Sequence, residues 1–191
     1  MDNTLLVPGK ITGFRIWDIS YLAKTEPWAG WAKRPWGSDS YLLSVNNKLR
    51  WNVEKIEAKC QLSLPKKRYQ EYIHGKAPSI HCHCGIYATY TLNEIIKHFS
   101  YHDQFFGVFG AISGWGRTIL ASKGFRCQYA KIEGLVFNPN LGEEYMVHVA
   151  RLYRVPLLSN HNSLRNEFPS SNLSALGVDG RHGVSILYPP F

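Results

Sequence analysis

Four consecutive positions, residues 81–84, hold two histidines and two cysteines in the order His-Cys-His-Cys. Thiolate and imidazole are the ligands of structural zinc sites, in which four of them surround the ion as a tetrahedron. Cys82 and Cys84 supply two ligands from one tight turn, and Gly85 lets the chain leave that turn. The run therefore indicates half of a zinc site, whose other two ligands come from elsewhere in the chain.

The other two ligands are expected upstream of this run. Cys60 ends a predicted strand, and His74 lies in the connection that follows, which completes a Cys₃His set with the spacing C-x₁₃-H-x₇-C-x-C. Three thiolates leave the zinc little Lewis acidity or open coordination, so we expect a structural role. His81 and His83 are alternatives to His74 as the fourth ligand. Cys127, which alternates with polar residues on a predicted strand, is expected to be a small buried side chain.

Several motifs around these ligands form a wider pattern. They are Gly13 to Trp17 (G-x-R-x-W), Trp51 with Ala58 to Cys60 (W…A-x-C), His74 with Ala77 and Pro78, Cys82 to Ala88 (C-x-C-G-I-Y-A), Gly110 to Arg117 and Gly124 to Ala130. Over about residues 9 to 158 the sequence thus resembles a loosely defined family of small, largely uncharacterised bacterial proteins. His74 matches the only histidine of the family pattern, although H-x-x-A-P is one residue longer than the family's H-x-A-P. The resemblance favours His74 as the fourth ligand and implies no catalytic residue.

The segment Gly110 to Arg117, with the turn and returning strand that follow, is also similar to the small barrels of the PUA, EVE and ASCH group. In that group the barrel cleft often holds a nucleobase between aromatic side chains, and the resemblance implies such a barrel here. Glycines at 110, 114 and 116 lie on one face of the predicted strand. They indicate strong curvature or close backbone approach.

Aromatic and basic residues occur together in several places. The chain has 22 Lys and Arg against 14 Asp and Glu, a net charge of +8, and 6 Trp. Aromatic rings stack on bases and basic side chains neutralise phosphate, which predicts binding to DNA or RNA. The alternative for Trp17, Trp51 and Trp115 is simple packing. The candidate nucleic-acid contacts are Arg15, Trp17, Trp28, Trp31, Lys33, Arg34, Trp36, Lys66, Lys67, Arg68, Trp115 and Arg117.

Two other functions stay open. A loop with three Trp, residues 24–40 (the Trp loop), could be the hot spot of a protein-interaction module, or of a subunit of a larger bacterial or mobile-element assembly. His98 and His102, four residues apart with Asp103 adjacent, could serve a metal-dependent hydrolase or nuclease. The chain has no G-x-S-x-G, phosphate-binding glycine loop or H-E-x-x-H. Binding is therefore favoured over catalysis, with the enzyme question undecided.

The elements that must position these residues follow from periodicity and turn signals. We predict strands over 10–19, 41–45, 49–60 (one long strand or a pair), 86–90, 108–120, 125–132 and 155–158, a turn at 122–124, and a basic connection or short helix over 66–72 (the basic connection). A T-x-x-E capping box at Thr91 and Glu94 opens one helix, and a second spans 141–153.

These elements predict an α+β fold that is β-rich, with a small curved sheet or PUA-like barrel, two or three helices and a zinc-pinned loop. Residues 1–158 are expected to form one domain, and 159–191 a tail that is irregular or packed over it. No apolar run approaches the roughly 20 residues of a membrane span, and the first residues do not read as a signal peptide. We therefore expect a cytoplasmic protein with reduced thiols and no membrane partner.

Overall fold

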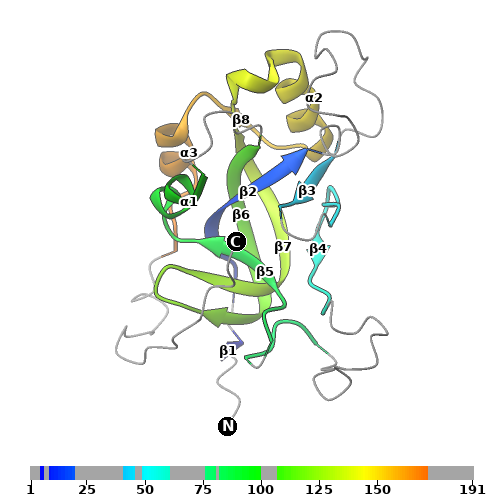
Figure 1. Ribbon diagram of the computed structural model, residues 1–191, viewed down its shortest axis with the longest axis vertical. Coiled ribbons are helices and arrows are strands. Elements are labelled where there is room, and N and C mark those ends of the chain that lie inside the picture. Colours follow the sequence, from blue (N-terminus) through cyan, green and yellow to red (C-terminus); the bar gives the residue numbers. More distant parts are fainter. Residues whose placement is uncertain are drawn as a thin grey trace.

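A computed structural model describes residues 5–6, 9–19, 41–45, 49–60, 76–80, 82–99 and 107–171 (Figure 1). Over these residues the fold is β-rich with three α-helices, as predicted. The elements are β1 (Leu5–Leu6), β2 (Ile11–Ile19), β3 (Leu42–Ser44), β4 (Ile56–Glu57), β5 (Ile86–Thr89), α1 (Leu92–Phe99), β6 (Val108–Leu120), β7 (Gly124–Val136), a 3₁₀ turn (Pro139–Leu141), α2 (Glu143–Tyr153), β8 (Leu157–Leu158) and α3 (His161–Glu167). The Trp loop, the basic connection, His74 and His81 lie outside the described residues.

The hairpin of β6 and β7 is the centre of the sheet (Figure 1). Its two 13-residue strands pair antiparallel from Gly110↔Leu135 to Leu120↔Phe125. The predicted hairpin is confirmed, and β7 continues past the predicted end at 132 to Val136. The hairpin is the longest strand pairing of the sheet, and β1, β2, β4, β5 and β8 pair with one or the other of its strands.

The strand pairings close into a ring, in which β6 pairs with β2, β2 with β5, β5 with β7, and β7 with β6. The β2–β5 pairing consists of one residue pair, Phe14↔Thr89. The sheet is mixed, because β8 adds to β7 in parallel while the other pairings are antiparallel. The strands therefore form a ring of hydrogen-bonded pairings, in agreement with the predicted small curved sheet. The ring is not a clear barrel.

Glycines let the strands approach closely, as predicted. A Cβ added at Gly110 would collide with the carbonyl oxygen of Gly134 on the paired strand. At Gly114 an added Cβ would lie 2.6 Å from the sulfur of Cys127. Gly116 has a φ of +79° and lies at a register shift of the hairpin, where a bulge needs a residue without a Cβ.

The apolar residues form two clusters on either side of β2. The larger cluster includes Trp17 and Trp51 and receives Tyr145, Met146 and Val149 from α2. The smaller cluster joins β2 to α1 and α3, which lie next to each other in Figure 1. Both faces of β2 are therefore covered. No helix within the described ranges is long and apolar enough to cross a membrane.

The first part of the predicted tail is folded onto the domain. Residues 161–167 form α3, a helix that the sequence analysis did not predict within this segment. Leu164 is fully buried, and Phe168 covers Gly134 of β7. Thr12 and Ser171 are joined by two hydrogen bonds of 2.9 and 3.3 Å. Residues after 171 lie outside the described part of the chain.

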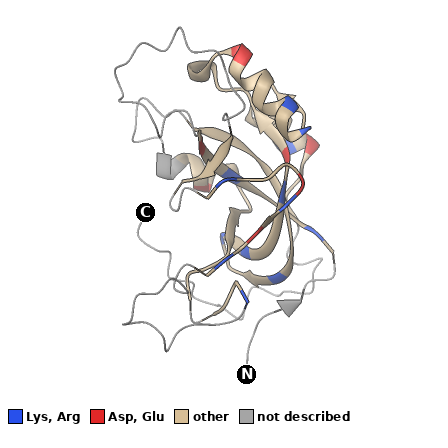
Figure 2. Cartoon of the chain, turned by 90° about the vertical axis from the view of Figure 1, so that its right-hand side faces the viewer, with Lys and Arg blue, Asp and Glu red and all other residues tan. Residues whose placement is uncertain are grey.

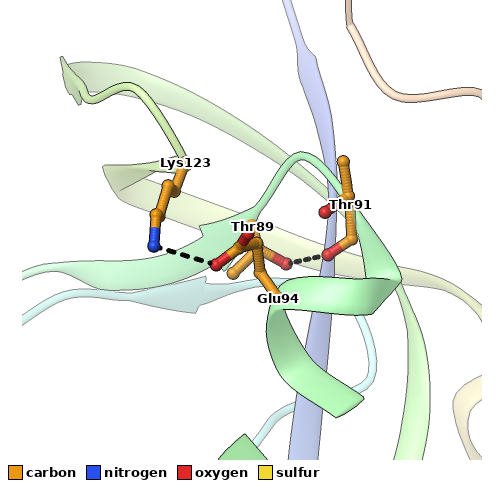
Figure 3. A network of polar contacts seen from close by, with 4 residues as sticks. All are labelled: Thr89, Thr91, Glu94 and Lys123. Carbon is orange, nitrogen blue, oxygen red and sulfur yellow. Dashed lines mark hydrogen bonds and ion pairs between the residues drawn. The ribbon is translucent and has the colours of Figure 1, made fainter. Parts of the chain in front are cut away.

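Two local predictions need refinement. Of residues 49–60, only Ile56–Glu57 and a single bridge from Leu43 to Arg50 show strand pairing, so neither a long strand nor a full pair forms. The helix after Thr91 is confirmed. Its first turn carries Glu94, whose carboxylate pairs with Lys123 at 3.3 Å, while the Thr89 hydroxyl donates to the Thr91 carbonyl (Figure 3).

Candidate metal centre and aromatic surface

Three thiols converge at the start of β5. The sulfur atoms of Cys60, Cys82 and Cys84 all lie within 4.8 Å of one another, and those of Cys60 and Cys82 are 3.6 Å apart. Tetrahedral zinc with bonds of about 2.3 Å to sulfur places its sulfur ligands roughly 3.8 Å apart. The three thiols therefore have the chemistry and the spacing to hold a metal ion. They are three of the four ligands that the sequence predicts.

Different elements bring these thiols together. Cys60 follows β4, which is held on β7 by strand pairing and by the hydrogen bond from Ala58 N to the Gln128 carbonyl (2.7 Å). Cys82 and Cys84 belong to residues 76–85, which we call the cysteine loop. The loop makes a turn in which Cys82 N donates to the Ser79 carbonyl at 3.1 Å. The site thus joins β4 to the beginning of β5.

Burial favours the protonated form of one thiol in this group, Cys84. Burial raises the pKa of the Cys84 thiol to about 12, and the nearby Cys82 and Cys60 add to the rise. Metal binding must therefore displace thiol protons, which makes the affinity increase with pH. Cys127 lies apart from this centre, as predicted. It is fully buried, and its thiol donates to the Ile86 carbonyl at 3.5 Å.

The fourth ligand is not found in the described part of the chain, where the group consists of the three cysteines. His83 is exposed, and its carbonyl accepts a hydrogen bond of 2.7 Å from the Tyr87 hydroxyl. The other two candidates, His74 and His81, lie outside the described residues. The choice among the three histidines stays a prediction.

Arg15 and Trp17 are not available for the predicted stacking and phosphate contacts. Trp17 is fully buried and packs edge-on against Trp51, with ring centroids 5.2 Å apart. The Arg15 guanidinium donates to the Tyr87 carbonyl and to Ser44 Oγ, and burial lowers its pKa to about 10. Trp51 covers the face of β2 on which Arg15 and Trp17 lie. These two residues therefore have a packing role, which corrects the sequence-based assignment.

Trp115 lies on a partly exposed surface that sequence reasoning found only in part. Its ring stacks on Tyr129 of β7, at 6.0 Å between centroids and 30° between planes. Lys10 Nζ lies 5.6 Å from the centroid of Trp115, and Lys55 Nζ lies 5.2 Å from that of Tyr129. We call Lys10, Lys55, Trp115 and Tyr129 the aromatic surface.

The hairpin register explains why half of this surface was missed. Trp115 faces Tyr129 across the hairpin because the register shifts between Trp115 and Thr118; the register counted from the turn would place Ala130 opposite Trp115. Gln128 holds Tyr129, since its amide donates to the tyrosine oxygen (3.1 Å) and to Glu57 (3.4 Å). Regular alternation would place Trp115 and Arg117 on one face of the strand, but the bulge after Trp115 interrupts that alternation. The Arg117 amide donates to the Gln128 side chain at 3.4 Å.

The other candidate residues fall outside what the structure describes. These are Trp28, Trp31, Lys33, Arg34, Trp36, Lys66, Lys67, Arg68 and His102; for His98 the described part is its helical backbone. Across the described ribbon, Lys and Arg occur on the strands as well as on α2 (Figure 2). The basic character is thus spread over the sheet that carries the aromatic surface.

No family model, curated protein or solved structure matches this chain.

Proposed function

We propose that this protein is a cytoplasmic nucleic-acid-binding module of a PUA-like kind, in which a structural zinc ion holds the cysteine loop. The observation that carries the proposal is the aromatic surface: a stacked Trp–Tyr pair with one lysine over each ring. Aromatic rings bind bases by stacking, while lysines bind the phosphates between them.

The surface is suited to bases that are not paired. A base in a duplex is already stacked on both faces, so a protein ring can receive it only from a single strand or after base flipping. The rings of Trp115 and Tyr129 come from neighbouring strands, and the lysines lie at 5.6 and 5.2 Å from their centroids. We therefore infer that single-stranded DNA or RNA is bound more tightly than a duplex.

Zinc is the metal that best matches the three thiolates, because soft sulfur ligands select zinc over magnesium or calcium. We propose His74 as the fourth ligand, as the family resemblance implies. Purified protein should then hold one zinc ion, and H74A should weaken its binding while H83A should not. An unchanged affinity in H74A together with a loss in H83A would transfer the assignment to His83.

Fluorescence anisotropy with labelled oligonucleotides tests the nucleic-acid proposal. Affinity should fall linearly in a plot of log K against log salt, as counterion release requires. W115A should bind a single strand roughly 5- to 150-fold more weakly, since one stacked base contributes about 1–3 kcal/mol. K10Q should weaken binding more than K123Q does. K123Q is the control, because it removes the same charge from Lys123 in the hairpin turn, away from the aromatic surface.

Failure of this experiment would favour the two alternatives. Absence of binding at low salt would overturn the proposal and turn the search to a protein partner or a larger assembly. Hydrolysis of the oligonucleotide that H98A or H102A abolishes, with folding intact, would favour the metal-dependent hydrolase. The present observations favour binding, because the described residues present an aromatic surface with lysines and no acidic metal cluster.

A further inference from the structure

Arg126 is a buried cation that makes its contacts with the cysteine loop. It lies on β7 and is 4% exposed. Its guanidinium donates to the carbonyl oxygens of Cys82, Cys84 (3.1 Å) and Ser79 (3.3 Å). Within the described residues it is paired with no carboxylate. A buried charge without an opposite charge nearby is costly, so the surroundings of Arg126 call for a balancing negative group.

The metal centre would supply that negative charge. Three thiolates around a divalent ion leave about one net negative charge when the fourth ligand is a neutral histidine. Two of these thiolates belong to Cys82 and Cys84, whose carbonyl groups Arg126 contacts. The arginine is therefore in place to compensate the centre without occupying a coordination position.

The contacts also fix the backbone on both sides of the C-x-C turn. Tyr87 is the cross-strand partner of Arg126, and the guanidinium carbon lies 5.6 Å from its ring centroid. Tyr87 in turn holds the His83 carbonyl. At Gly85 the φ is +126°, and an added Cβ would lie 3.1 Å from the Cβ of Arg126. The loop therefore lies directly on these two side chains.

We infer that Arg126 is the positioning residue of the metal centre: it orients the cysteine loop through its carbonyl groups and offsets the negative charge of the thiolate–metal group. This inference rests on the metal part of the proposed function. It is independent of nucleic-acid binding. Groups that support metal ligands in this way commonly contribute 10- to 100-fold to metal affinity.

The test compares the zinc affinities of R126Q, R126K and the unchanged chain by competition with a chromophoric chelator. R126Q removes the charge and should bind zinc about 10- to 100-fold more weakly. R126K keeps the charge but cannot reach three carbonyls at once, so its affinity should lie between the other two. Replacing zinc with cobalt gives a second readout, since the thiolate–cobalt absorption bands should shift in R126Q.

R15Q is the matched control. Arg15 is also a poorly exposed arginine bound to a carbonyl of β5, but its contacts are Tyr87 and Ser44 rather than the cysteines. R15Q should lose stability yet bind zinc within about twofold of the unchanged chain. If R126Q fails to fold, R126K and R15Q still give the comparison. Equal zinc affinity in R126K, R126Q and the unchanged chain would overturn the role of Arg126, whereas a failure of the unchanged chain to bind zinc would overturn the metal proposal itself.

Discussion

The β6–β7 hairpin and the cysteine loop are held in opposite ways. The hairpin is held by its own backbone, which pairs strand to strand over most of its length. The cysteine loop has its carbonyl groups held by side chains, namely Arg126 and Tyr87. The sequence separation from Cys82 to Arg126 is 44 residues. The loop therefore depends on the finished hairpin, whereas the hairpin can form from local contacts.

This difference determines how each region should respond to change. Backbone pairing is insensitive to most side chains but intolerant of added volume where strands approach closely. A loop held by a few polar groups and a metal is weakened by the loss of any one of them, and most by the loss of the metal. Four changes, taken from the largest expected effect to the smallest, test the contrast.

Loss of the metal should separate the two regions most clearly. C82S removes one of the three thiolates, so zinc should be released and the free energy of unfolding should fall by several kcal/mol. Hydrogen exchange should accelerate more in the cysteine loop than in the hairpin. C127A is the control, because this buried thiol lies apart from the centre and its removal should leave one zinc ion bound. Equal zinc content in C82S and the unchanged chain would contradict the proposal that Cys82 is a zinc ligand.

Added volume in the hairpin should destabilise the hairpin and leave zinc binding intact. G110A places a methyl group against the Gly134 carbonyl and should lower the free energy of unfolding by about 3 kcal/mol. Zinc binding by the folded fraction should remain stoichiometric. Denaturation in urea measures the loss. G142A meets nothing within 4 Å, but its φ of +78° and ψ of 151° lie in a region essentially confined to glycine, so it should lose about 1–2 kcal/mol from backbone strain alone. A loss in G110A no larger than that in G142A would argue against close packing.

Y87F removes a single hydrogen bond from the loop, the one to the His83 carbonyl. Its ring still covers Arg126, so the free energy of unfolding should fall by about 0.5–1 kcal/mol. The effect should appear as faster exchange within the cysteine loop. A global loss of stability, measured as equal acceleration in the hairpin, would show that the two regions unfold together.

The smallest effect is expected at the hairpin turn. Lys123 pairs with Glu94 of α1, and the two side chains are 52% and 24% exposed (Figure 3). Solvent screens such a pair, so K123A should change the free energy of unfolding by about 0.3 kcal/mol and by less at high salt. Thermal melts at two salt concentrations measure this. A large loss would mean that the turn contributes more to the hairpin than its backbone pairing implies.

The sequence predicted regions whose signals are local. The hairpin and α2 follow from periodicity and turn residues, and their predicted bounds agree closely with the structure. The three cysteines that converge were predicted as a group, because Cys82 and Cys84 form a compact C-x-C signal and Cys60 ends the predicted strand before it. Arg126 was missed because a polar residue beside Cys127 on an alternating strand suggests an exposed face. It is buried because the cysteine loop covers it, which no pattern within β7 reveals.

Trp17 and the C-terminal segment are further cases in which contacts with distant parts of the chain decide the structure and local sequence patterns do not reveal them. Whether a tryptophan stacks on a ligand or fills a core depends on what lies over it. For Trp17 that is Trp51, from a distant segment. The absence of periodicity after residue 158 gave no sign of a helix, yet α3 forms over seven residues, with Leu164 buried and Phe168 against Gly134. Such a short helix is held by tertiary contacts rather than by its own propensity.

The two hydrogen bonds between Thr12 and Ser171 have a practical meaning for anyone who shortens this protein. Residue 158 looks like a natural place to end the domain, but a chain cut there would lose α3 and the bonds from Ser171. The cut would uncover the apolar cluster around Phe14, Ile16 and Val136. Exposed apolar patches of this kind promote aggregation. A chain trimmed after Ser171 keeps that cover, and so it is the shorter form expected to remain monodisperse in solution.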